Sequence, residues 1–190
     1  MKPRLLFSVL LLAGGLTQGV ARAAAFDRLL TDQSALTFIV TQMNVPVEGR
    51  FKTFDAELQF DPASPELASG SIEIDLTGID AGSDEANDEV AGPQWLDISR
   101  YPKARFTVSS VHPLDAGRYR ISGQLTIKGH TKTVTATATL ETQDSRGVLD
   151  GDLVIRRADF AIGEGAWADF GTVANEIPVH FRLVLGTSRD

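Results

Sequence analysis

The chain has 190 residues, of which 18 are Lys or Arg and 25 are Asp or Glu, and it contains no cysteine. The lack of cysteine excludes disulfides, thiol catalysis, Cys-ligated zinc and iron–sulfur clusters. The acidic balance argues against nucleic acid and against an anionic membrane surface as partners.

The first 23 residues have the pattern of a secretory signal peptide. Lys2 and Arg4 precede an apolar stretch, and Ala21-Arg22-Ala23 supplies a cleavage site of small residues. The apolar stretch is too short to span a bilayer comfortably. We therefore expect cleavage after Ala23 or after Ala25, export of the mature chain, and a single folded domain over residues 26–187.

Beyond the signal, most segments alternate apolar and polar residues with period 2. The segment "YRISGQLTIKG", for example, places Tyr119, Ile121 and Leu125 on one face. This pattern is typical of antiparallel strands with one buried and one solvated face. About eight such segments are separated by short turn signals, and either a closed barrel or a two-sheet sandwich accommodates that many edges. The serial order favours an all-β fold, an extended antiparallel barrel of about eight strands.

One interval, near residues 83–99, does not alternate. Ser83 is a suitable N-cap, Asp84 and Glu85 follow in the first turn, and Pro93 fits the first position of a second short helix. We expect a short helical excursion here that covers one end of the barrel.

The inward face includes several small residues, Gly123, Ala136, Ala138 and Gly151. Small inward residues can leave a lumen, and a barrel of about eight strands can enclose one small ligand. Alternatively, these residues face large aromatic rings and complete a filled core. The pattern alone does not decide between the two.

Motifs for chemistry are weak. Gly163, Gly165 and Ala168 match G-x-G-x-x-A, but no crossover helix and second parallel strand follow, so a nucleotide loop is not expected. The three histidines lack metal-ligand spacing, and no G-x-S-x-G elbow is present. We expect no metal and no cofactor.

Four segments in the same order resemble the YceI-like family of exported bacterial proteins. They are "GRFKTFDAELQFDP", "WLDISRYPKARF", "GQLTIKGHTKTV" and "RADFAIGEGAW…VANEIPV". The resemblance covers nearly the whole mature chain. It implies a lipocalin-like barrel, a periplasmic location, and a hydrophobic lumen that holds a polyisoprenoid or similar amphiphile without catalytic residues.

The leading hypothesis is a non-enzymatic periplasmic protein that carries, stores or sequesters an isoprenoid or fatty amphiphile. A membrane-protein partner and a homodimer stay open. Two alternatives are a barrel isomerase or hydrolase that acts on a hydrophobic substrate, and a stress or adhesion protein that acts through its outer surface. The residues expected to line the lumen, with the two tryptophans at its ends, are Phe38, Leu58, Phe60, Ile72, Ile74, Trp95, Phe106, Ile121, Leu125, Ala136, Ala138, Leu153, Trp167, Phe181 and Leu183.

Overall fold

A computed structural model describes residues 25–143 and 145–188, and these residues form an antiparallel β-barrel. The expected signal peptide, residues 1–23, lies outside the described residues. Eight strands of the described chain make the barrel wall, and the short strand β1 (Arg28–Leu29) adds to its lower edge. The wall strands are β2 (Ala35–Gln42), β3 (Val45–Gln59), β4 (Ser69–Asp80), β5 (Lys103–Pro113), β6 (Arg118–Ile127), β7 (His130–Gln143), β8 (Arg146–Arg156) and β9 (Glu176–Gly186).

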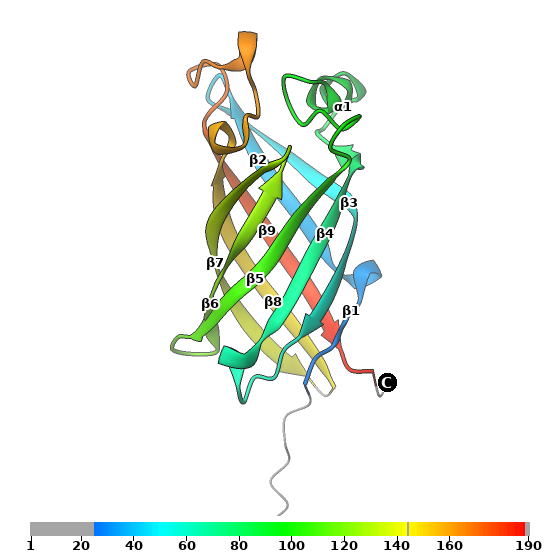
Figure 1. The fold of residues 1–190 in the computed structure, drawn as a ribbon, viewed down its shortest axis with the longest axis vertical. Coiled ribbons are helices and arrows are strands. Elements are labelled where there is room, and N and C mark those ends of the chain that lie inside the picture. The colour runs from blue at the N-terminus through cyan, green and yellow to red at the C-terminus, as the bar shows by residue number, and fades with distance from the viewer. Residues whose placement is uncertain (1–24, 144, 189–190) are drawn as a thin grey trace, which may run out of the picture.

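The strands follow one another around the wall in chain order, and β9 closes it (Figure 1). β9 pairs with β8 from Glu176 to Leu185, and it pairs with β2 over the four residues Val179–Arg182. The expected closed meander is therefore confirmed. Closure leaves every wall strand with two neighbours, which removes the exposed edges that favour aggregation.

Strand pairing is uneven along the wall. β4 and β5 pair over five residues, Ser71–Asp75 with Lys103–Thr107, although both strands are longer. The ladder between β7 and β8 begins only at Thr137 and Asp152. The β3–β4 ladder shifts register between Phe51 and Thr53, which lets one long strand follow the curvature of the barrel.

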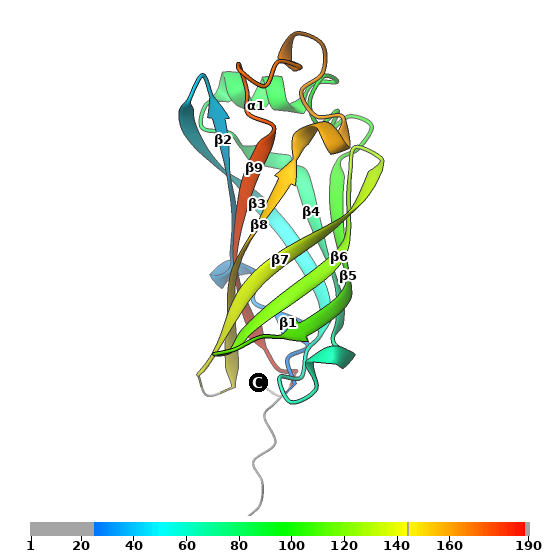
Figure 2. The same ribbon diagram turned by 90° about the vertical axis from the view of Figure 1, so that its left-hand side faces the viewer.

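Two segments form a roof over the upper end of the barrel (Figure 2). The first contains α1 (Asp84–Ala91), whose N-cap Ser83 accepts a hydrogen bond from the Ala86 amide. It continues through turns at Gly92–Arg100 instead of the second helix expected at Pro93. The second joins β8 to β9 and contains two single-turn helices, η3 (Arg157–Phe160) and η4 (Gly165–Trp167).

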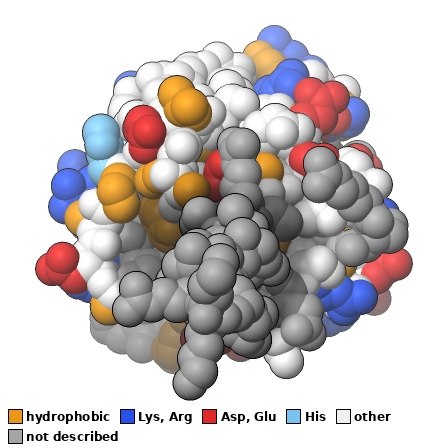
Figure 3. All heavy atoms as spheres, turned by 90° about the horizontal axis from the view of Figure 1, so that it is seen from below, with side chains coloured by type: hydrophobic (Ala, Val, Ile, Leu, Met, Phe, Trp, Pro, Cys, Tyr) orange, Lys and Arg blue, Asp and Glu red, His pale blue; other side chains and the backbone are white. Residues whose placement is uncertain are grey.

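The lower end carries the β3–β4 connection with η2 (Pro65–Leu67), the start of β1 and the end of β9. Seen from below, most Lys, Arg, Asp and Glu side chains lie at the periphery, and hydrophobic side chains appear closer to the centre (Figure 3). Buried Phe26, Phe60 and Tyr119 belong to the core cluster that includes this end. A second cluster, which contains Trp95 and Phe160, lies under the roof.

Candidate functional site

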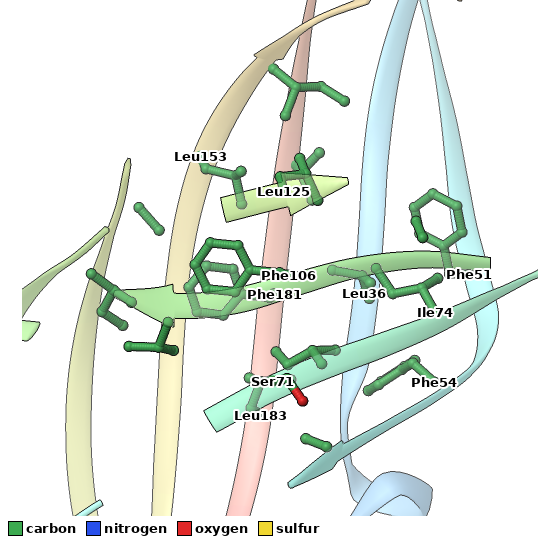
Figure 4. Close-up of a pocket in the computed structure, with 18 of the residues that line it drawn as sticks. Leu36, Phe51, Phe54, Ser71, Ile74, Phe106, Leu125, Leu153, Phe181 and Leu183 are labelled. Carbon is green, nitrogen blue, oxygen red and sulfur yellow. The ribbon is translucent and has the colours of Figure 1, made fainter. Parts of the chain in front are cut away.

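The barrel encloses a cavity of about 240 Å³. Its wall includes Val90 and Trp95 at the roof and Leu149 and Leu185 at the lower end, so the lumen extends along the barrel. In Figure 4, Leu36, Phe51, Phe54 and Ile74 lie on one side of this space, and Phe106, Leu125, Leu153 and Phe181 lie on the other.

The lining is apolar along nearly all of its length. The polar residues that touch the cavity are Glu57, Gln59, Ser69 and Ser71, near the lower ends of β3 and β4. These four occupy the outward phase of their strands, next to inward residues such as Leu58 on β3 and Ile72 on β4. An apolar cavity of roughly 150 Å³ stays dry and accepts small hydrocarbons. The larger lumen of this barrel therefore suits an uncharged hydrocarbon chain.

Inward glycines keep the lumen open by accommodating phenylalanine rings at the wall. A Cβ added at Gly123 would lie 2.4 Å from Cζ of Phe106, and one at Gly151 would lie 2.7 Å from Cζ of Phe181. Such contacts are too short for real side chains, so both rings occupy the space over a glycine. The two hypotheses for the small inward residues are therefore both partly correct, because these residues pack against aromatic rings and a lumen still remains.

The upper end of the lumen is closed by contacts between the two roof segments. The Gln94 carbonyl accepts hydrogen bonds from the amides of Gly163 (2.8 Å) and Glu164 (2.9 Å). The Trp167 indole donates to Oε1 of Glu89 at 2.6 Å, and its ring centroid lies 5.6 Å from that of Trp95. Trp95 is buried and lines the cavity, so the roof presents an aromatic surface to whatever occupies the lumen.

Arg157 holds the second roof segment in shape. It is 1% exposed, and its guanidinium donates to the carbonyls of Ile162, Gly163, Trp167, Val173 and Ala174 at 2.8–3.1 Å. Burial lowers the pKa of this guanidinium, although an arginine stays charged at neutral pH. Gly163 is required for this arrangement, because a Cβ there would lie 2.3 Å from Nη1 of Arg157, and its φ is +72°. Of the two glycines in the G-x-G-x-x-A match, Gly163 thus makes room for a buried arginine, and Gly165 lies against the Gln94 side chain.

Lys128 ties the same segment to the β6–β7 turn. Its buried ammonium donates to the Ala161 carbonyl at 2.7 Å and to Oε2 of Glu164 at 2.9 Å. Together with Arg157, it fixes a connection that has little regular secondary structure above the lumen.

Thirteen of the fifteen residues expected to line the lumen touch the cavity, and two do not. Ala138 is buried in the wall, where a Cβ on the neighbouring Gly151 would lie 2.6 Å from its own Cβ. Trp167 packs on Trp95 at the roof instead of lining the cavity, so the two tryptophans lie at one end and not at opposite ends. Contact with a ligand stays a prediction for all fifteen. Those that touch the cavity are Phe38, Leu58, Phe60, Ile72, Ile74, Trp95, Phe106, Ile121, Leu125, Ala136, Leu153, Phe181 and Leu183.

Several lining residues lie outside the set expected from the sequence. Most continue the same alternation and could have been found by extending each strand in register. Ile162 comes from an irregular roof segment, where no period indicates which side chain points inward, and Val90 comes from the short helix α1, outside the strand alternation. The lining residues that were not named include Leu36, Val40, Phe51, Phe54, Ala56, Leu76, Ile79, Val90, Leu96, Val108, Val111, Ile127, Leu149, Ile155, Ile162, Ile177, Val179 and Leu185.

Comparison with known proteins identifies the family. Residues 28–185 match the YceI-like domain. The chain belongs to the YceI-like family. Its barrel is similar to the crystal structure of BcnA from Burkholderia cenocepacia, with a TM-score of 0.80 and 39% sequence identity over 82% of this chain and 98% of that one.

Two further comparisons place this YceI-like protein among its relatives. An UPF0312 protein of Pseudomonas putida is 32% identical over 93 residues, which is 49% of this chain and 48% of the relative, so this match spans about half of each protein. A polyisoprenoid-binding domain from Saccharophagus degradans shares the fold, with a TM-score of 0.66 and 19% identity over 87% of this chain and 99% of that one.

Outside the lumen, this YceI-like protein offers little chemistry in the part described. His180 faces outward, with Nδ1 3.0 Å from Oδ1 of Asp152. Among the described residues, no group of three or more potential metal ligands converges. In the same residues, no helix has the length and apolar character needed to cross a bilayer.

Proposed function

We propose that this protein is an exported periplasmic binding protein that holds an isoprenoid or similar long amphiphilic lipid in its lumen, for transport, storage or sequestration. The observation that carries the proposal is the apolar cavity of about 240 Å³ between the roof and the lower end. Burying a hydrocarbon chain there contributes about 0.8 kcal/mol for each CH₂ removed from water. The polyisoprenoid-binding description of the Saccharophagus degradans domain agrees with this ligand class, and the likeness itself concerns the fold.

The cavity also bears on the two alternatives. A stress or adhesion protein with a filled barrel is not supported, because the barrel has a lumen. A barrel enzyme needs titratable groups that converge on a substrate. Among the described lining residues, Glu57 is the one with an ionisable side chain, and it occupies an outward position on β3. The geometry favours binding.

Native mass spectrometry of the protein purified from a membrane-containing lysate tests the proposal. We expect a co-purifying lipid, and after its extraction we expect uptake of an added C20 prenol. The variant Ala136→Leu fills part of the lumen, and Thr137→Leu introduces the same side chain on the exposed face of the same strand. Uptake should fall for Ala136→Leu alone. A protein that carries no lipid and takes up no prenol would contradict the proposal, and cell fractionation checks the periplasmic location.

A further inference from the structure

The tip of the β2–β3 hairpin exposes an unusual amount of apolar surface. Met43 is 68% exposed, Val45 is 60% exposed and Val47 is 36% exposed. Half-exposed Phe170 lies in the adjoining loop, which the hairpin holds through a bond from the Met43 amide to the Thr172 carbonyl at 2.9 Å. Five of the seven exposed large hydrophobic side chains in the described chain are on this hairpin and loop; the five are Ile39, Met43, Val45, Val47 and Phe170.

The turn at this tip contains a residue, Met43, that is unfavourable in the backbone conformation it adopts. Met43 and Asn44 form a two-residue turn with φ values of 49° and 64°. A turn with two positive φ values prefers Asn, Asp or Gly, and a large side chain is costly there. Asn44 fits this preference and Met43 does not. Since the Met43 side chain is also mostly exposed, the fold gains little from it, and a role outside the fold is indicated.

The exposed surface is continuous with the lumen. Phe38 and Val40 line the cavity on β2, and Val40 is the register partner of Val47 on β3. Val45 lies two residues further toward the tip on the same face. Exposure rises along this path, from buried Phe38 through half-buried Val40 to exposed Val47 and Val45. An apolar track therefore leads from the lumen to the hairpin tip, which projects at the upper end of the barrel (Figure 2).

The charges around the tip restrict its partner. Residues 39–48 contain one charged residue, Glu48, and no Lys or Arg. At the same end of the barrel, α1 carries the four carboxylates of Asp84, Glu85, Asp88 and Glu89. Lys and Arg near a membrane surface attract anionic lipids, and carboxylates have the opposite effect. The tip is therefore suited to an electrically neutral apolar surface.

We propose that the hairpin tip inserts into the surface of a zwitterionic lipid bilayer, and that the ligand enters or leaves the lumen along the apolar track. This inference rests on the proposed function, because the lipid in the lumen needs a source or a destination. A bilayer supplies both the apolar environment that covers Met43 and Val45 and the hydrocarbon chain that continues into the lumen.

Flotation with phosphatidylcholine vesicles tests the proposal. The variant carries Met43→Asn and Val45→Thr, which remove apolar surface while Asn suits a positive φ and Thr suits a strand. The control is Leu67→Gln, because Leu67 is 76% exposed at the opposite end of the barrel. We expect the natural protein and the control to float, and the double variant to bind vesicles roughly tenfold more weakly or worse.

Three results would overturn the proposal. The double variant could float as well as the control, vesicles of anionic phosphatidylglycerol could bind better than neutral ones, or attachment could require a membrane protein in the vesicles.

Uptake of a C20 prenol from solution is measured in parallel. If the double variant takes up dissolved prenol normally but exchanges it slowly with vesicles, both proposals stand. If the natural protein floats but takes up no prenol, the proposed function is contradicted, whereas the proposed bilayer contact stands.

Discussion

Replacing Arg157 with methionine should strongly destabilise the protein, because methionine fills much of the volume but donates no hydrogen bonds. Three of the lost bonds, to the carbonyls of Ile162, Gly163 and Val173, are buried. A buried acceptor without a partner costs about 1–3 kcal/mol. Relief from burying the guanidinium offsets part of this sum. We therefore expect the free energy of unfolding to fall by about 4 kcal/mol, a large share of the ~5–15 kcal/mol that stabilises a typical domain.

Urea unfolding, followed by tryptophan fluorescence and far-UV circular dichroism, measures this loss. Arg156→Met is the matched control, because Arg156 is the adjacent arginine and its side chain is exposed. The control should change stability by less than about 0.5 kcal/mol. If Arg157→Met also cost less than about 1 kcal/mol, the buried carbonyls would have found other partners, and the assignment of Arg157 as the support of the roof would be wrong.

Three further predictions concern the wall and the roof. Gly123→Ala should displace the Phe106 ring into the lumen, lowering the free energy of unfolding by about 1–3 kcal/mol and reducing prenol uptake in the same native mass spectrometry assay. The Gly171 amide and the Thr172 hydroxyl donate to Asp169 and lower the pKa of its carboxyl. The ionised carboxylate therefore stabilises the fold above its unfolded-state pKa, and this stabilisation is lost as the pH falls through the lower folded-state pKa. Asp169→Asn should therefore reduce the loss of stability measured by urea unfolding between about pH 5 and pH 2. Ser83→Ala removes the N-cap of α1 and should cost about 1 kcal/mol in thermal unfolding, with hydrogen exchange increased in α1 but not in the barrel wall.

The barrel could be predicted from the sequence because alternation reports directly which side of a strand is buried. Phe106, Leu125 and Leu183 all line the cavity as expected, since each belongs to a long alternating segment. Ala138 has the same phase and does not touch the cavity; its register partners are Tyr119 and Gly151, and the Phe181 ring occupies the space over Gly151. Which cross-strand neighbour covers an inward residue depends on register, and one strand considered alone does not reveal it.

The roof could not be predicted to the same depth. Its position near residues 83–99 was expected, but the role of Arg157 depends on carbonyls spread over residues 162–174, which irregular backbone turns toward one point. No local pattern distinguishes such an arginine from a solvated one. Likewise, the bond from Trp167 to Glu89 joins residues far apart in the chain, so the sequence indicated an aromatic residue at a barrel end without showing which end.

The rings packed over inward glycines have a consequence for selectivity. Phe106 over Gly123 and Phe181 over Gly151 cannot move closer to the wall, and the strands hold them from behind. At these two positions the bore of the lumen is therefore set by aromatic rings that the wall supports, while most of the remaining lining is Leu, Ile, Val and Ala. A tube of fixed calibre sorts molecules by thickness, so methyl branching along a chain should matter more to admission than chain length does. Exchanging a single glycine and phenylalanine pair would be a direct way to retune that calibre.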